Sequence, residues 1–482
     1  GKPSCENRLF RPCRVIFRRQ ALGDPGEGVP VGVVGVGFSL RIYEPDEYAL
    51  AAVRAVRQVI GPQLQHRPVA VVQAEAVLLG DVPAEGGVHV EELPVQGIAV
   101  FLGDAQVLAV HPGPEGGEFS AEGVGGAAGD ALGYAVEFLD EETIFSRYGE
   151  NGITGYDLVN GVAEISDDTQ MTLFTANGLL LGTTRGMTRG IMGSYPSYIA
   201  FCYKDWLRTQ CEKYPLNEEY PYSWLINIPE LYNRRAPGNT CLTAIENGAN
   251  GTIDEPINRS KGCGGVMRVA PIGLYFETKR RTIDEIDMIG AETAAITHGH
   301  ELGYIPAAGL VHIVQSLSHN EDISLLDAVL DMKEALRRQF TNRKHLSEQI
   351  DLIDKAIVLS KENIDDLEAI RELGQGWVAE ETLAIAIYCS LKYSDDFDKA
   401  IIASVNHSGD SDSTGAVTGN ILGAYLGLKS IPKKYLDNLE LKDVILEIAD
   451  DLYNDCKISE YGSYHDEIWE QKYIYKTYKR TK

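Results

Sequence analysis

The chain has 482 residues, 44% of them hydrophobic, and is long enough for one large domain or two to three ordinary domains with a substantial core. Its 70 acidic and 44 basic residues give a formal net charge of −26, which argues against binding of nucleic acid or an anionic membrane through a generic basic surface. The eight cysteines form no CxxC pair, and the sequence shows neither a signal peptide nor an apolar run of about 18 residues, so we expect a cytoplasmic protein with reduced thiols.

Residues 1–120 differ in composition from the rest of the chain. They contain 20 Val but only one Lys and one Asn. Two strand-like runs, Val31–Val36 and Val69–Leu79, stand among Gly and Pro residues without a repeat or an amphipathic period. We leave this Val/Gly/Pro-rich segment unassigned and interpret it as disordered or as foreign to the domain that follows, joined by fusion or by an erroneous upstream reading frame. The start at Gly1 instead of Met fits a fragment.

From residue 121 the hydrophobic pattern becomes helical, with apolar residues three to four positions apart and no convincing alternating strand. The sequence therefore predicts an all-α domain over residues 121–455, followed by a C-terminal tail over residues 456–482. The predicted helices are Asp168–Leu181, Ile289–Gln315, Ile323–Phe340, Glu380–Tyr393, Ser413–Leu428 and Lys442–Tyr453.

Two short acidic clusters, Ser166–Thr169 and Asp410–Thr414, each stand at the start of a predicted helix. Each cluster packs carboxylates and hydroxyls into a few positions, and crowded carboxylates repel one another unless a cation lies between them. Hard oxygen donors without His or Cys suit Mg²⁺ or Mn²⁺ better than Zn²⁺. The sequence therefore predicts that the two clusters are the halves of one oxygen-lined metal centre.

Two other interpretations of these clusters were weighed. Ser166 followed by acids is also a good helix N-cap with negative charge on the first turn. The second cluster matches the first half of an EF-hand loop, but its twelfth position is Ile421, where a calcium loop needs a bidentate Glu. An EF-hand is therefore not expected, whereas the N-cap interpretation stays open.

Five motifs resemble those of the ADP-ribosylglycohydrolase family, in the family's order, and the resemblance covers residues 121 to about 455. The motifs are Gly126–Gly133 with Glu137 following, Ser166–Met171, Gly262–Arg268, Thr297–His300 and Gly409–Ser413. The resemblance implies an all-α orthogonal multi-helix bundle that holds two Mg²⁺ or Mn²⁺ ions. The ligands that it implies are Ser166, Asp167, Asp168, Asp410, Asp412 and Ser413.

The resemblance also implies roles for residues outside this ligand set. Glu137 corresponds to a mobile loop carboxylate near the substrate ribose. The loop at Gly264 and Gly265, together with His298, corresponds to the contact with the diphosphate, and Gly376 lies in a segment that resembles part of the nucleoside pocket. The alternatives are a solvated surface carboxylate for Glu137 and a core or helix-capping role for the histidines.

The activity that the resemblance implies is hydrolysis of the N- or O-glycosidic bond between ADP-ribose and a modified protein side chain, arginine being the first choice. Water would be activated at the dinuclear centre. Glu137, Asp168 and Asp412 are the candidates for the catalytic base, and Asp130 of the first motif is assigned to substrate binding. The expected partner is an ADP-ribosylated protein or a small molecule that contains ADP-ribose.

Two other functions remain open, a protein that binds ADP-ribose without cleaving it and a hydrolase of another ribosylated metabolite. The acceptor residue and the oligomeric state do not follow from the sequence. One departure from the family concerns the segment Gly113–Gly117, which stands where a hydrophobic helix usually leads into the first motif. We therefore expect the first core helix to be truncated or distorted.

Overall fold

The computed structural model describes residues 115–216, 220–278, 281–320 and 322–480, together with six short strands nearer the N-terminus. The chain divides into two compact units, Gly1–Gly113 and Pro114–Lys482. The strands of the first unit pair as β1 (Arg19–Gln20) with β2 (Gly37–Phe38), β3 (Leu40–Ile42) with β4 (Ala76–Leu78), and β5 (Val100–Leu102) with β6 (Gln106–Leu108). The predicted run Val69–Leu79 contains β4, whereas Val31–Val36 lies outside the described residues.

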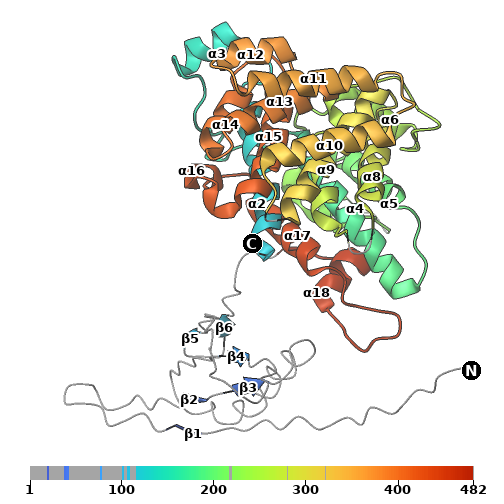
Figure 1. Ribbon diagram of the computed structural model, residues 1–482. Coiled ribbons are helices and arrows are strands. Elements are labelled where there is room, and N and C mark those ends of the chain that lie inside the picture. The colour runs from blue at the N-terminus through green and yellow to red at the C-terminus, as the bar shows by residue number, and fades with distance from the viewer. Residues whose placement is uncertain are drawn as a thin grey trace, which may run out of the picture. The chain divides into compact units, whose positions relative to one another are not determined.

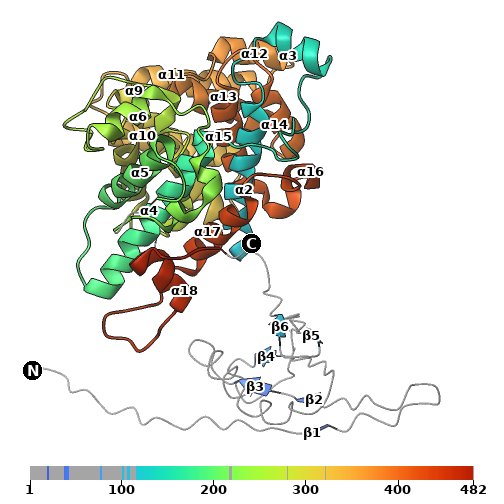
Figure 2. The same cartoon turned by 180° about the vertical axis from the view of Figure 1, so that it is seen from behind.

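The second unit is all-α, as predicted (Figures 1 and 2). Its α-helices are α2 (Glu115–Tyr134), α3 (Glu141–Tyr148), α4 (Asp167–Arg189), α5 (Tyr195–Cys211), α6 (Asn239–Glu246), α7 (Ala270–Tyr275), α8 (Ile283–Ala295), α9 (Glu301–Ser318), α10 (Leu325–Gln339), α11 (Leu346–Leu359), α12 (Asp366–Leu373), α13 (Ala379–Lys392), α14 (Phe397–Val405), α15 (Ser411–Leu426), α16 (Lys433–Leu436), α17 (Lys442–Asn454) and α18 (Glu467–Trp469). Short 3₁₀-helices are η2 (Trp224–Asn227), η3 (Pro229–Tyr232), η4 (Cys263–Gly265) and η5 (Leu428–Ser430), and η6 (Glu470–Tyr475) is a π-helix.

One predicted helix was wrong. The range Ile289–Gln315 is two helices, α8 and α9, with a break at residues 296–300. Gly299 lies so close to the Asn258 carbonyl that a Cβ on it would overlap this oxygen, and the backbone N–H of Leu302 donates to Nδ1 of His300, 3.0 Å away. The backbone therefore ends α8, passes close to Asn258 and begins α9, for which His300 is the N-cap.

The expectation of a truncated first core helix was also wrong, because α2 runs without interruption over 20 residues. It packs antiparallel against α15 through glycines that are four residues apart and share one face of each helix. A Cβ on Gly129 would overlap the Gly415 carbonyl oxygen, and a Cβ on Gly419 would overlap that of Gly125. The two backbones are thus in direct contact, and the end of α2 lies beside the start of α15.

The core of the second unit surrounds α9. All residues from Leu302 to Ser318 are buried, which requires neighbours on every side of this helix. Helices α7, α8, α10, α13 and α15 supply these neighbours. None of the described helices is long and apolar enough to cross a membrane.

The segment after residue 455, expected as a tail, packs on the bundle. Trp469 and Tyr473 are buried, and the indole Nε1 of Trp469 donates to the hydroxyl of Thr184 on α4 at 3.0 Å. Lys472 is also buried, with its ammonium 2.7 Å from Asp451 and 2.9 Å from Glu447 on α17. The C-terminal residues therefore tie α4 and α17 together at the end of the bundle that lies opposite α3 and α12 (Figures 1 and 2).

Candidate metal centre

Three segments that are distant in the sequence meet where α2 ends and α15 begins. The turn after α2 carries Glu137, the first turn of α15 carries Asp410 and Asp412, and the first turn of α4 carries Asp167 and Asp168. The glycine contact between α2 and α15 fixes the first two segments relative to each other. All five carboxylates are buried.

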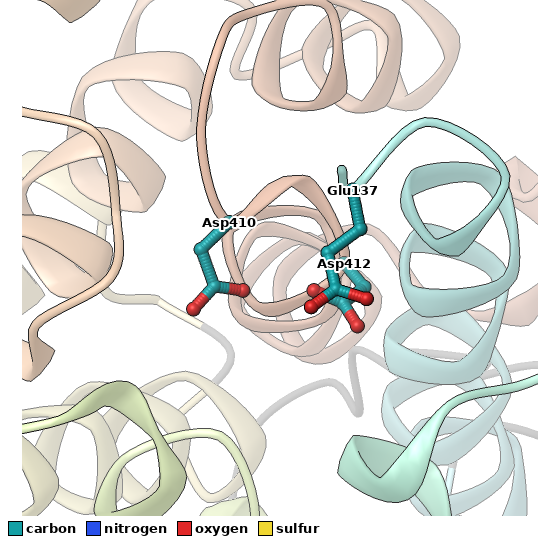
Figure 3. Close-up of side chains that lie close together, drawn as sticks. All are labelled: Glu137, Asp410 and Asp412. Carbon is teal, nitrogen blue, oxygen red and sulfur yellow. The ribbon is translucent and has the colours of Figure 1, made fainter. Parts of the chain in front are cut away.

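The carboxylates of Glu137, Asp410 and Asp412 lie close together (Figure 3). Each offers an oxygen, and these oxygens all lie within 4.8 Å of one another. Burial, followed by the charges of Asp412 and Asp410, raises the pKa of Glu137 far above its ordinary value. A solvated surface position for Glu137 is therefore wrong, since its side chain is buried among acids.

Asp167 and Asp168 face the same cluster. Burial raises the pKa of each, and the next largest cause for both is the negative charge of Asp412. One carboxylate oxygen of Asp168, Oδ2, and one of Glu137, Oε2, are buried without a hydrogen-bond partner. The two acidic clusters predicted from the sequence thus lie on the same side of the fold, as a shared cation site requires.

The donor set fits a hard divalent cation. Buried polar atoms in folded proteins nearly always have a partner, and buried carboxylates of like charge are stable together only when protonated or when bound to a cation. The unpartnered atoms and the three acids that lie close together offer carboxylate oxygens from Glu137, Asp168, Asp410 and Asp412, and the thiol of Cys263 lies against Asp410. The carboxylate oxygens are ligands that suit Mg²⁺ or Mn²⁺.

Each acidic cluster contributes a helix N-cap, Ser166 for α4 and Asp410 for α15. The hydroxyl of Ser166 accepts from the backbone N–H of Asp168 at 3.2 Å, so the N-cap interpretation is confirmed for this residue. The backbone N–H of Ser413 donates to Asp412 at 2.9 Å and to Asp410 at 3.3 Å. These bonds hold both acidic turns in shape at the two helix N-termini, where negative charge is favourable.

Asp130 on α2 is fully buried and engaged with α4. Its carboxylate accepts from the backbone N–H of Ser166 at 2.9 and 3.1 Å, from the backbone N–H of Thr169 at 3.1 Å, and from the Thr169 hydroxyl. Burial, and then the charge of Asp412, raises its pKa. The contacts of Asp130 therefore position the first turn of α4, and its expected contact with substrate stays a prediction.

The glycine loop, here Gly262–Gly265, lies against His298. A Cβ on Gly264 would stand 2.9 Å from Cε1 of the imidazole, and a Cβ on Gly265 would stand 2.6 Å from the Gly303 carbonyl oxygen on α9. Only glycine therefore lets the loop lie this close to the ring. Burial, followed by the charge of Arg268, lowers the pKa of His298 to about 3, so the ring is neutral.

The segment around Gly376 joins the glycine loop to the acidic turn of α15. The backbone N–H of Cys263 donates to the Trp377 carbonyl at 3.2 Å, and that of Asp410 donates to the Gln375 carbonyl at 2.8 Å. Gly376 has φ of +81° and packs on Thr414, where a Cβ would stand 2.7 Å from Cγ2. The structure thus brings the predicted diphosphate and nucleoside segments beside Asp410 of the acidic cluster.

Sequence reasoning missed three features of this site. Thr169 anchors Asp130, and Arg268 is a fully buried cation behind the glycine loop. Phe138 and Trp377, both exposed, stack with ring centroids 6.2 Å apart beside Glu137 and Gly376. The sequence offered a signal only for Arg268. A charged residue within the apolar run that follows the glycine loop indicates a buried cation with a specific role.

The sequence of this chain is similar to those of known proteins. The sequence model of the ADP-ribosylglycohydrolase family matches residues 123–461. ADP-ribosylhydrolase ARH3 of Mus musculus is 29% identical over 207 residues, which cover 38% of this chain and 53% of that protein. ADP-ribosylarginine hydrolase Tri1 of Serratia proteamaculans (strain 568) is 37% identical over 73 residues, which cover 15% of this chain and 20% of that protein.

A solved ADP-ribosylglycohydrolase-related protein complex superposes with a TM-score of 0.46 at 23% identity, covering 70% of this chain and 98% of that chain. The chain spans about half the length of the ARH3 proteins that it matches.

Proposed function

The chain belongs to the ADP-ribosylglycohydrolase family, and from this premise we propose that it is a metal-dependent hydrolase of the glycosidic bond between ADP-ribose and a modified protein side chain. The observation that supports this most directly is the buried cluster of Glu137, Asp410 and Asp412, whose oxygens lie within 4.8 Å of one another. Burying three acids side by side costs stability unless they serve a ligand. A cation that holds a sugar is the ligand that agrees with the family.

Two divalent ions, Mg²⁺ or Mn²⁺, are proposed to bind at this cluster and at the adjoining acids of α4. Their proposed ligands are Ser166, Asp167, Asp168, Asp410, Asp412 and Ser413. When bound, such ions supply a template for vicinal ribose hydroxyls and lower the pKa of a bound water. Glu137 lies close enough to Asp410 and Asp412 to join the ligand set as well.

Proton transfer and binding of the diphosphate are proposed for groups of the protein itself. Glu137 is our first candidate for holding or moving the proton at the scissile bond, because it sits on the turn after α2 and not within a helix. Asp168 and Asp412 are the alternatives for the base, because both lie in the same buried cluster. The proposed diphosphate site is the glycine loop with His298, where backbone and a neutral ring can approach an anion.

Arginine is the proposed acceptor, because Tri1, which shares 73 aligned residues with this chain, is an ADP-ribosylarginine hydrolase. The test is release of free ADP-ribose from an ADP-ribosylated arginine peptide with Mg²⁺ or Mn²⁺ present, followed by chromatography. We expect turnover by the full chain. Asp412→Asn should lower the rate of ADP-ribose release by about 10²-fold or more, because the substitution replaces a carboxylate of the proposed metal site with a neutral amide.

Asp395→Asn is the matched control, since Asp395 is exposed. It should keep full activity. No release from ADP-ribosylated arginine, from ADP-ribosylated serine or from O-acetyl-ADP-ribose would contradict the proposal. Calorimetric binding of ADP-ribose without release from any of these substrates would instead identify a protein that binds ADP-ribose and does not cleave it.

A further inference from the structure

Arg268 is a buried cation whose partners are all uncharged. Arg268 follows η4 and precedes α7 in the chain, and its side chain is fully buried. Its guanidinium donates to the sulfur atoms of Met171 and Cys241, at 3.5 and 3.4 Å, and its ζ-carbon lies 4.6 Å from the centre of the Tyr203 ring. Because burial of an unpaired charge is costly, this arrangement requires a reason beyond packing.

The shortest bond of the guanidinium leads to His298. Nη2 of Arg268 donates to the hydroxyl oxygen of Thr297 at 2.7 Å, and the same hydroxyl oxygen lies 2.8 Å from Nδ1 of His298. Thr297 and His298 are both buried. Three consecutive groups therefore form one hydrogen-bonded chain from the cation to the imidazole.

The chemistry of the groups gives this chain a direction. A guanidinium has no acceptor, so the Thr297 oxygen accepts from Arg268 and its single proton is left to donate elsewhere. The acceptors within reach are Nδ1 of His298 and the sulfur of Cys241, and burial raises the pKa of Cys241, which keeps this sulfur a neutral thiol and a weak acceptor. The positive charge of Arg268 also favours a lone pair, and not an N–H group, on the facing ring nitrogen.

The opposite edge of the ring faces the glycine loop. A Cβ on Gly262 would stand 3.3 Å from Nε2 of His298, and so would a Cβ on Gly264. If Nδ1 accepts, a neutral imidazole carries its one proton on Nε2. The loop glycines leave space at this nitrogen for an atom of a ligand.

We infer that Arg268 and Thr297 are positioning residues that hold His298 as the neutral Nε2–H tautomer, so that the ring presents one hydrogen-bond donor to an anionic oxygen at the glycine loop. The inference rests on the proposed function only for the identity of that oxygen, a phosphate oxygen of ADP-ribose.

The test is nitrogen NMR of the full chain labelled with ¹⁵N-histidine, with His298 assigned by its absence in His298→Gln. We expect Nδ1 of His298 to resonate as an unprotonated nitrogen and Nε2 as a protonated one. Thr297→Ser should keep this pattern, since it keeps the hydroxyl, whereas Thr297→Val and Arg268→Met should shift the population toward the Nδ1–H tautomer. A protonated Nδ1 in the unmodified protein, or an unchanged pattern in Thr297→Val, would overturn the inference.

Thr209→Val is the matched control, because Thr209 is equally buried and its hydroxyl donates to the Trp206 carbonyl, with no contact to His298. It should leave the His298 resonances unchanged. Calorimetry then links the tautomer to the ligand: ADP-ribose should bind about three- to tenfold more weakly to Thr297→Val than to Thr297→Ser. The expected tautomer together with no binding of ADP-ribose to the unmodified protein would support the inference and contradict the proposed function.

Discussion

Glu122 on α2 is a single buried acid that lies outside the acidic cluster of the candidate metal centre. Its Oε1 atom has no hydrogen-bond partner, and its side chain borders an apolar cavity lined by residues such as Leu173, Leu274 and Ile448. Burial raises the pKa of Glu122 from 4.5 to about 8. The folded protein therefore holds a proton here that the unfolded chain has already released near neutral pH.

The sign of the resulting pH dependence follows from this difference. Between pH 4.5 and 8 the folded state binds more protons than the unfolded state, so the free energy of unfolding falls as the pH rises, by up to about 1.4 kcal/mol per pH unit. Glu122→Met should remove this slope and stabilise the protein at pH 8. Urea unfolding at pH 5 and pH 8 measures both effects.

Glu142→Met, at an exposed position of α3, is the control and should keep the slope of the unmodified protein. The same slope in Glu122→Met as in the unmodified protein would show that Glu122 is ionised when folded.

At the scale of single residues, the sequence predicted the acids of the metal centre better than their partners. The convergence of the clusters around Asp168 and Asp412 was predictable, because each cluster crowds carboxylates that repel one another unless a cation lies between them. The hydrogen bonds between Thr169 and Asp130 and between Thr297 and His298 could not be predicted from the sequence. These contacts join side chains through the fold, and no local spacing encodes them.

Among the contacts between helices, that of α2 with α15 fixes the position of Glu137 relative to Asp410 and Asp412. In Gly419→Ala the new Cβ would overlap the Gly125 carbonyl oxygen, and backbone cannot move aside as a flexible side chain can. We expect the helices to separate, with a loss of at least about 2–3 kcal/mol of stability and weaker binding of Mn²⁺, since Asp412 moves relative to Glu137. Chemical denaturation and calorimetric titration with Mn²⁺ measure the two losses.

Gly186→Ala on α4 provides the comparison, because a Cβ there meets only the flexible side chain of Met192, 3.3 Å away. It should stabilise the helix by up to about 1 kcal/mol and leave Mn²⁺ binding unchanged. Equal stability of the two variants would mean that the glycine contact tolerates a methyl group.

Helices were predictable where a long amphipathic stretch stood alone. Four of the six predicted ranges, those now seen as α4, α10, α13 and α17, have clear apolar periods, and α15 was recognised from its small residues. The break between α8 and α9 was missed because apolar residues continue through it, and the chain turns there only to meet Asn258. Short helices such as α12 were missed because two turns give too few apolar positions to define a period.

The C-terminal segment supplies a second prediction at this scale. Lys472 is buried between Asp451 and Glu447, and its loss would leave Asp451 without its cation, whereas Glu447 would keep Arg480, whose Nε lies 2.9 Å away. Lys472→Met should therefore cost about 3–5 kcal/mol of stability. Lys433→Met, which removes an exposed ion pair with Asp437, should cost less than about 1 kcal/mol. Similar melting temperatures for the two variants would show that the segment contributes little to the fold.

At the scale of the whole molecule, the second unit holds a complete core. The connected cluster of buried apolar residues runs from Val124 to Tyr473, so its described members all lie within Pro114–Lys482. A fragment of residues 114–482 should therefore unfold cooperatively at the same temperature as the corresponding transition of the full chain. Scanning calorimetry of both proteins tests this, and a markedly lower melting temperature for the fragment would contradict it.

The metal centre draws its acids from the turn after α2, from α4 and from α15, so that the first and last of these carboxylates are 275 residues apart in the chain, from Glu137 to Asp412. An ion held there would act as a cross-link that closes a very long loop, and the unfolded polypeptide contains no equivalent binding place. Binding of the ion would then indicate that folding is complete. Removal of the ion by a chelator would make the whole bundle more sensitive to proteases, and not one end alone.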